Sequence, residues 1–307
     1  NNVQVISSFI GKELGLDPVI LTRRIERPQS RFAFLAGYGY TLNPEQALSI
    51  ERMNFSGIYL NDVLVRSYPR CASMCHVIGF VNLARIGSAG IEQRFEKYLR
   101  GVPGLLLSKK DGKRNELYDE RRLNVTPHKG ASVKLTLDQN VQFIVERAIA
   151  NAREKQDASA AWAIVERVKT GEILAMASNP AFDLTDFRHA TSDQLRNRCI
   201  ANVYEPGSTF KIVVISAALN ESVIKPSDVI DCEKGSWFYA NRPLRDYHSY
   251  DKLTVADVIK KSSNIGAAKI ALLLGNSTLY TYLKAYGIGE ATGIELPGEE
   301  VGILRQV

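Results

Sequence analysis

The strongest constraint on the fold comes from residues 204–211, YEPGSTFK, and the apolar run after them. A Pro-Gly pair interrupts the chain, and residues 212–219 (IVVISAAL) contain neither Gly nor Pro, so the run predicts a helix. Because this helix is apolar on nearly every side, we expect it to be buried at the centre of a domain. Ser208 and Lys211 would then lie on one face, about one turn apart.

A serine and a lysine in this arrangement suggest nucleophilic chemistry. A serine hydroxyl is a weak nucleophile until a base takes its proton. Lys211 can be that base if burial disfavours its charge and lowers its pKa. The N–H groups at a helix start can hold a developing oxyanion. The pair alone does not establish a site, because Ser-x-x-Lys also occurs by chance in helices.

A second candidate lies at residues 260–266, KKSSNIG, between two predicted helices. Ser262 and Asn264 are two residues apart, so in a loop both side chains can point into one cleft. Ser262 could relay a proton, and Asn264 could hold a substrate amide. The alternative is structural, with these residues ending one helix and capping the next.

Together the two motifs follow the order Ser-x-x-Lys, then Ser-x-Asn, that is typical of penicillin-recognising serine enzymes. The sequence resembles class B penicillin-binding proteins, the D,D-transpeptidases that cross-link peptidoglycan. The resemblance covers nearly the whole chain. In addition to the two motifs, it rests on these segments: YP at 68–69, HVIGF at 76–80, GIE at 90–92, LTLD at 135–138, TGEILAMAS at 170–178, LTV at 253–255, TGI at 292–294 and LPGE at 296–299.

The resemblance implies an α+β fold with two domains. Residues 1–131 would form an irregular N-terminal pedestal domain of the dimerisation type. Residues 132–307 would form a serine β-lactamase-like transpeptidase domain with a central sheet flanked by helices, incomplete at its C-terminal end. The resemblance further implies that the native protein is longer at both ends. A membrane anchor would precede Asn1, with the domains outside the cytoplasm.

The resemblance also implies roles for the candidate residues. Ser208 would attack the penultimate D-Ala carbonyl of a peptidoglycan stem peptide, and its backbone N–H would supply half of the oxyanion hole. Lys211 would be the acylation base, Ser262 a proton shuttle and Asn264 a contact for the substrate amide. The expected partners are stem peptides, β-lactam antibiotics and cell-division membrane proteins, since the SSNIG form resembles the division or sporulation branch.

The sequence departs from the family pattern at the third motif. No Lys-Thr-Gly follows Asn264, and Lys169-Thr170-Gly171 precedes Ser208, where a hairpin turn is predicted. In the family, the strand carrying this motif supplies the second oxyanion N–H. Loss of one such donor commonly slows a reaction by about a hundredfold or more. We therefore expect residues 1–307 alone to be acylated poorly or not at all.

Two other functions stay open at this point. A serine β-lactamase shares the first two motifs, although the pedestal-like residues 1–131 argue against it. A non-catalytic division scaffold would account for the lack of a third motif. Rapid turnover of the acyl group would indicate the lactamase, and the gene sequence beyond Val307 would separate the scaffold from the enzyme.

Charge and residue spacing argue against a metal-binding or nucleic-acid-binding protein. The net charge of +6 is mildly basic and fits a solvated surface. The four cysteines and four histidines follow no zinc-ligand spacing, and no nucleic-acid-binding signature is present. We therefore predict no metal, no cofactor and no nucleic-acid partner, and we propose no disulfide.

Local signals predict individual elements. Asn43, Asp138, Thr254 and Ser277 are each placed to cap a helix. Residues 162–168 and 173–177 predict a β-hairpin, and residues 265–274 a helix that Gly275 ends. Alternation predicts strands at 57–65 and 132–137, whereas 101–114 suggests a loop and 226–252 irregular chain.

Overall fold

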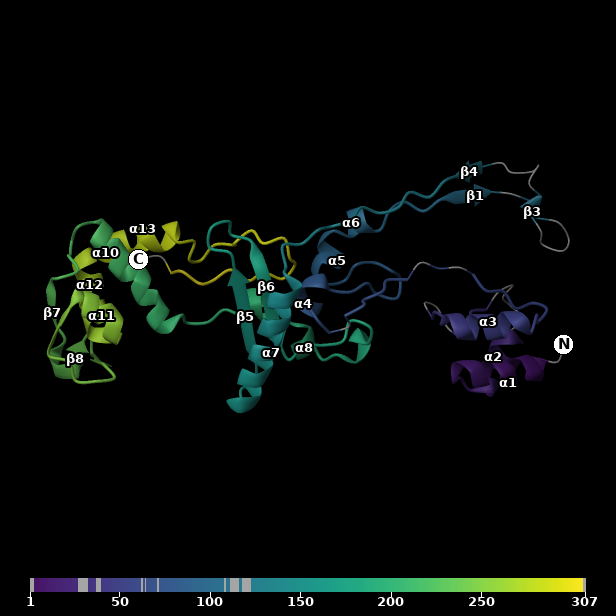
Figure 1. Cartoon of the computed structure of the whole chain (residues 1–307), viewed down its shortest axis with the longest axis horizontal. Coiled ribbons are helices and arrows are strands. Elements are labelled where there is room, and N and C mark those ends of the chain that lie inside the picture. Colours follow the sequence, from purple (N-terminus) through teal and green to yellow (C-terminus); the bar gives the residue numbers. More distant parts are fainter. Residues whose placement is uncertain are drawn as a thin grey trace. The chain divides into compact units, whose positions relative to one another are not determined.

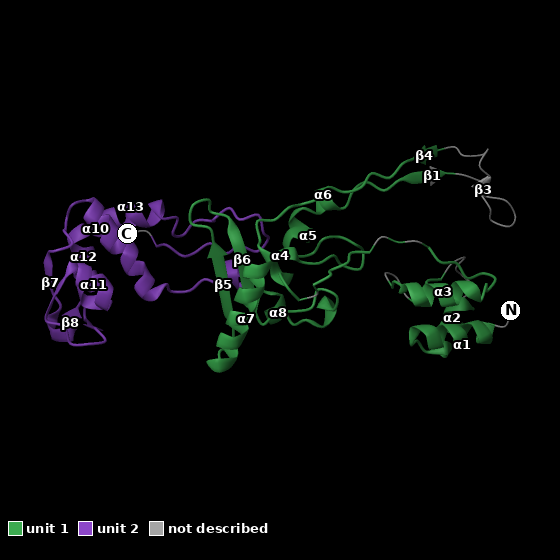
Figure 2. Cartoon of the chain, in the orientation of Figure 1, with its two compact units in different colours: residues 1–196 green, residues 197–307 purple. Residues whose placement is uncertain are grey.

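A computed structural model describes most of the chain, which divides into two compact units, residues 1–196 and 197–307 (Figure 2). The described residues are 3–26, 33–36, 40–61, 63, 65–70, 72–107, 109–110, 116–117 and 123–305. The predicted domain boundary at 131/132 stays a prediction. One of the four cysteines, Cys71, lies outside the described residues.

The first unit begins with three helices around a small apolar core. They are α1 (Val3–Leu14), α2 (Pro18–Ile25) and α3 (Pro44–Arg52). Ile6 and Ile10 of α1 and Leu21 of α2 are buried in this core. Asn43 caps α3 in a reciprocal capping box with Gln46, which confirms the helix start predicted from the sequence.

The same unit contains the predicted hairpin, which packs against a long helix. β5 (Ala161–Glu166) and β6 (Ile173–Asn179) pair antiparallel, and α7 (Gln139–Lys155) contacts both. Asp138 caps α7 by accepting N–H groups from its first turn, as predicted. Gln142 joins helix to sheet, because its fully buried amide exchanges two hydrogen bonds with the Met176 backbone.

The remaining elements of this unit are short. They are α4 (Cys75–Ile78), α5 (Gly90–Arg94), α6 (Glu96–Leu99), β1 (Leu105–Leu107), β2 (Lys109–Lys110), β3 (Glu116–Leu117), β4 (Leu123–Val125), the 3₁₀ turn η2 (Phe187–His189) and α8 (Ser192–Leu195). β1 pairs with β4, and β2 pairs with β3.

Three predictions for this unit were wrong. The described residues within 57–65 form no strand, because alternation alone supplies no partner strand. Residues 132–137 also join no ladder, although Thr136 donates its hydroxyl to the Ile173 carbonyl beside β6. The predicted loop at 101–114 instead carries β1 and β2.

The second unit is mainly helical (Figure 1), and the candidate residues lie on or next to its helices. Its helices are α9 (Arg198–Ala201), the 3₁₀ turn η3 (Gly207–Phe210), α10 (Lys211–Asn220), the 3₁₀ turn η4 (Glu233–Gly235), α11 (Val255–Lys261), α12 (Asn264–Leu274) and α13 (Asn276–Ala285). α10 packs on α12 and α13. Its interior positions Ile215, Ala217 and Ala218 are buried as predicted, whereas Ile212 is 60% exposed.

The predicted caps of this unit are confirmed in two of three cases. Thr254 caps α11 by accepting the Asp257 N–H, and α12 ends at Gly275, whose φ of 83° favours glycine. Ser277 was expected to cap the last helix, but α13 already begins at Asn276.

The stretch 226–252 is not irregular as predicted. β7 (Val229–Asp231) pairs with β10 (Lys252–Thr254), and β8 (Ser236–Tyr239) pairs with β9 (Arg242–Arg245). β9 leads directly into the polar contacts that surround the start of α12.

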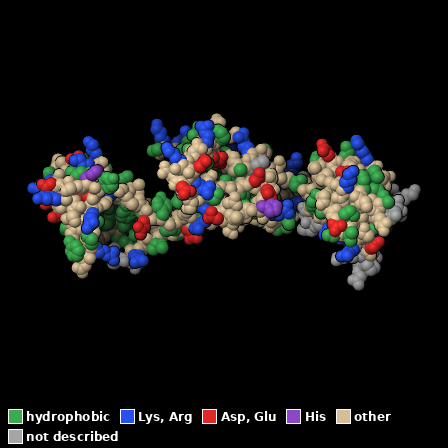
Figure 3. Space-filling model, turned by 90° about the horizontal axis from the view of Figure 1, so that it is seen from below, with side chains coloured by type: hydrophobic (Ala, Val, Ile, Leu, Met, Phe, Trp, Pro, Cys, Tyr) green, Lys and Arg blue, Asp and Glu red, His purple; other side chains and the backbone are tan. Residues whose placement is uncertain are grey.

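The mixture of helices and antiparallel strand pairs confirms the predicted α+β class. In the face shown by Figure 3, basic and acidic side chains are interspersed, as expected for the mild net charge. Among the residues that the structure describes, no helix combines the length and apolar character needed to cross a membrane.

Candidate active site

Ser208 lies in a tight turn that leads into α10. The turn is η3, a 3₁₀ segment rather than the first turn of the α-helix that the sequence suggested. Gly207 has a φ of 61°, a conformation that glycine adopts at little cost. Thr209 donates its hydroxyl to the Pro206 carbonyl at 2.6 Å, which closes the turn. Ser208 is consequently exposed, one turn before the half-buried Lys211.

Ser262 and Asn264 lie where α11 ends and α12 begins. Ser262 has left-handed backbone angles, φ 57° and ψ 42°, which few residues other than glycine adopt. Ser263 is the cap of α12, since its hydroxyl accepts the Gly266 N–H at 2.9 Å. The capping role considered from the sequence therefore belongs to Ser263, and the side chains of Ser262 and Asn264 are available for other contacts.

The other three predicted residues come together around the Lys211 amine. Lys211 Nζ lies 3.1 Å from Ser208 Oγ and 2.8 Å from each of Ser262 Oγ and Asn264 Oδ1. It also donates to the Ser262 carbonyl oxygen at 2.7 Å. Ser262 Oγ donates to Ser208 Oγ at 3.0 Å, so the two hydroxyls and the amine form a closed triangle.

Two opposing effects set the charge of Lys211. Partial burial lowers its pKa below the ordinary 10.5, because burial disfavours the ammonium. The negative charge of Asp246 acts in the opposite direction, although the pKa remains lowered. Lys211 therefore loses its proton more readily than a lysine in water does.

The geometry allows proton transfer away from Ser208. A neutral Lys211 can accept the Ser208 proton directly, since the two atoms are within hydrogen-bond distance. Ser262 offers a second route, because its hydroxyl touches both groups. Asn264 is held in one orientation: its Nδ2 donates to the Arg245 carbonyl at 2.9 Å while its oxygen faces Lys211.

One charged residue of this site was not predicted from the sequence. Asp246 follows β9 and accepts hydrogen bonds from Ser263 and from the first backbone N–H groups of α12. No motif marks it, and its stretch was expected to be irregular. The only available signal was the position of a carboxylate, which is favourable at the start of a helix.

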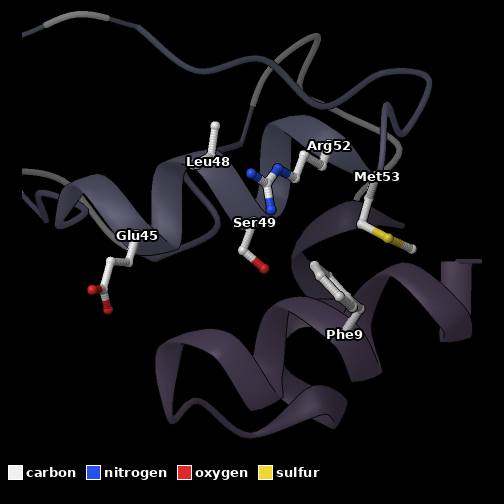
Figure 4. Close-up of a pocket in the computed structure, with 6 residues that line it drawn as sticks. All are labelled: Phe9, Glu45, Leu48, Ser49, Arg52 and Met53. Carbon is white, nitrogen blue, oxygen red and sulfur yellow. The ribbon is translucent and has the colours of Figure 1, made fainter.

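Two other regions do not form part of this arrangement. Residues 169–171, the Lys-Thr-Gly that precedes Ser208, form the turn between β5 and β6, as predicted. A groove of about 390 Å³ lies in the first unit, between α1 and α3. Figure 4 shows Phe9 of α1 facing this groove, with Ser49 and Arg52 of α3 and with Met53. It contains none of the predicted site residues.

Two domain families match the chain. Residues 38–135 match the penicillin-binding protein dimerisation domain, and residues 161–306 match the penicillin-binding protein transpeptidase domain. The second match contains all four predicted site residues.

Individual relatives agree with both matches. The chain is 33% identical to peptidoglycan D,D-transpeptidase FtsI of Escherichia coli K12 over 93% of its own length and 48% of that protein. It is 34% identical to stage V sporulation protein D of Bacillus subtilis, over 87% of the chain and 42% of that protein. The chain thus spans about half the length of the curated relatives it matches.

A solved structure gives the same result. Penicillin binding protein 3 of Mycobacterium tuberculosis, complexed with ampicillin, matches with a TM-score of 0.69 and 29% identity. The match covers 79% of this chain and 50% of that one. The resemblance drawn from the sequence is confirmed: the chain belongs to the penicillin-binding proteins in which a dimerisation domain precedes a transpeptidase domain.

Proposed function

We propose that this protein is a peptidoglycan D,D-transpeptidase that works through an acyl-enzyme on Ser208. The observation that carries the proposal is the closed triangle of Ser208 Oγ, Lys211 Nζ and Ser262 Oγ, with all three distances between 2.8 and 3.1 Å. A nucleophile needs a base within hydrogen-bond distance, and Lys211 with its lowered pKa meets that need.

In the proposed reaction, Ser208 Oγ attacks the carbonyl carbon of the penultimate D-Ala of a stem peptide. The hydroxyl proton passes to Lys211 as the new C–O bond forms. The carbonyl oxygen becomes an oxyanion, which the Ser208 backbone N–H stabilises. The peptide C–N bond then breaks, and the leaving nitrogen receives a proton through Ser262, so that free D-Ala departs.

The acyl group is then transferred. An amine of a neighbouring stem peptide attacks the ester carbonyl, and Lys211 with Ser262 removes the amine proton. Ser208 regains its proton, and a new amide bond joins the two stems. Asn264 would orient the acylated stem, because its second Nδ2 hydrogen is directed away from the Arg245 carbonyl that takes the first.

β-Lactams would react at the same serine. Opening of the lactam ring breaks its C–N bond and leaves the acyl group on Ser208, while the leaving nitrogen stays attached to the acyl group. The M. tuberculosis relative complexed with ampicillin supports this part of the proposal. We extend the proposal to a role in division or sporulation, with membrane attachment and division proteins as partners, since one relative is a sporulation protein.

Acylation by a fluorescent penicillin tests the proposal. In a chain that also carries a Lys-Thr-Gly strand after Asn264, we expect a stable covalent adduct in the intact mass, located on the peptide that contains Ser208; residues 1–307 alone should form little of it. Ser208→Ala should abolish the adduct, and Ser277→Ala, an exposed serine of α13, should leave it unchanged. Labelling that survives Ser208→Ala would refute the assignment of the nucleophile.

The same assay distinguishes a β-lactamase from a transpeptidase. A β-lactamase would release the hydrolysed drug rapidly, whereas a transpeptidase would keep the adduct. The match of residues 38–135 to a dimerisation domain supports the transpeptidase. For the scaffold, the gene sequence following Val307 is decisive, because a Lys-Thr-Gly there favours the enzyme and a stop codon favours the scaffold.

A further inference from the structure

The turn that carries Ser262 and Asn264 is fixed by a single carboxylate. Asp246 Oδ1 accepts the backbone N–H of Asn264 at 2.5 Å and that of Ile265 at 3.1 Å. Its Oδ2 accepts the hydroxyl of Ser263 at 2.6 Å. Both oxygens of one side chain thus bind three consecutive residues of the turn.

These contacts explain why the residue between Ser262 and Asn264 is a serine. Ser263 is fully buried and donates its hydroxyl to Asp246, while the same oxygen accepts the Gly266 N–H. A small side chain with both a donor and an acceptor meets these requirements. With Ser263 turned inward, Ser262 on one side and Asn264 on the other remain exposed near Lys211.

The strained part of the turn lies next to these contacts. Ser262 has a left-handed backbone, which is unfavourable for a residue with a β-carbon. Such a conformation persists only where surrounding contacts enforce it. The anchor at residues 263–265 supplies those contacts, and Ser262 then presents both its hydroxyl and its carbonyl to Lys211.

We propose that Asp246 is a positioning residue of the Ser208 site, which anchors the 262–264 turn so that its oxygen atoms surround the Lys211 amine. The inference rests on the proposed function for its catalytic meaning. Asp246 has no hydrogen bond to Lys211 among the contacts of the described residues, so it acts through the turn and through its charge. That charge favours the protonated form of Lys211.

Amide hydrogen exchange tests the anchor without requiring any activity. In the whole chain, Asp246→Ala should speed exchange of the Asn264 and Ile265 amides by about tenfold to a hundredfold, because hydrogen bonds to a charged acceptor are lost. Asp228→Asn is the matched control, since Asp228 precedes β7 and accepts the Lys225 N–H instead. Exchange of the Ile215 amide in α10 shows whether the rest of the second unit has loosened.

The pH dependence of acylation by a fluorescent penicillin, measured on a chain that also carries a Lys-Thr-Gly strand after Asn264, tests the effect of the charge. Asp246→Asn keeps the shape of the side chain and removes the charge that favours the ammonium. The rise of the acylation rate with pH should therefore occur at a lower pH than in the wild type. A residue with only a structural role would lower the rate without moving this midpoint, and Asp228→Asn should do neither.

The outcomes separate the two proposals. Unchanged exchange at residues 264 and 265 in Asp246→Ala, or an unchanged midpoint in Asp246→Asn, would overturn the role of Asp246. If Asp246→Ala also speeds exchange at Ile215, the unit has loosened as a whole, and the midpoint in Asp246→Asn decides. If a wild-type chain that also carries a Lys-Thr-Gly strand after Asn264 is not acylated, the proposed function fails, while exchange at 264 and 265 still decides the role of the anchor.

Discussion

Replacement of Lys211 by methionine is the most informative single change at the site. Methionine has nearly the same length but cannot accept or donate a proton at the position of Nζ. The change removes the base that lies 3.1 Å from Ser208 Oγ, and with it three further contacts to oxygen. General base catalysis commonly contributes about 10²–10⁴-fold to a rate. At about 1.36 kcal/mol per tenfold, the barrier to acylation should rise by roughly 3–5 kcal/mol.

The assay is the rate of acylation of Ser208 by a fluorescent penicillin at saturating drug concentration, in a chain that also carries a Lys-Thr-Gly strand after Asn264. Lys225→Met is the control, because Lys225 is an exposed lysine of the same unit outside the site. Thermal unfolding of each preparation shows that the variants are folded. An acylation rate for Lys211→Met within about threefold of the wild type would refute the role of Lys211 as the base.

Three other predictions concern pH, the second serine and the core. The acylation rate should rise with pH and level off above the pKa of Lys211, which lies below 10.5, because only the neutral amine accepts a proton; a rate independent of pH would contradict this. Ser262→Ala should slow acylation by about ten- to a hundredfold, since the hydroxyl that bridges Ser208 and Lys211 is lost; labelling kinetics would show this, and an unchanged rate would exclude the shuttle. Ile270→Ala should lower the free energy of unfolding by about 2–5 kcal/mol, because Ile270 is fully buried in the core of the second unit. Urea titrations measure this change. A loss below about 1 kcal/mol would show that the core closes around the cavity.

Helix ends were the part of the fold that could be predicted best. Asn43, Asp138 and Thr254 all cap the helices predicted for them, because a cap depends on a few neighbouring residues and needs no tertiary partner. The meeting of Ser208 with Ser262 depended on a resemblance, since no local rule brings two distant segments together. The structure adds the distances between them.

The strand pairs were harder to predict, and the turn between β8 and β9 shows why. Ala240 and Asn241 have φ values of 47° and 61°, the positive values of the tight turns that suit hairpins. A sequence signal for such a turn is Asn-Gly or Asp-Gly, and Ala-Asn is neither. Without that signal the hairpin was not predicted. Asp246 was not predicted either, because its role depends on the path of the chain after β9.

The number of hydrogens around Lys211 has a consequence for ligand binding. Four oxygen atoms lie within 2.7–3.1 Å of Nζ, whereas an ammonium carries three hydrogens and a neutral amine two. At least one of these oxygens therefore receives no hydrogen from the ammonium, and at least two receive none from the neutral amine. The longest contact is the one to Ser208, where a neutral amine would accept instead of donate. The lysine alone therefore cannot supply a hydrogen bond to each of the four oxygens. A ligand that donates an N–H group to Asn264 Oδ1 would supply the missing hydrogen bond and favour the neutral lysine.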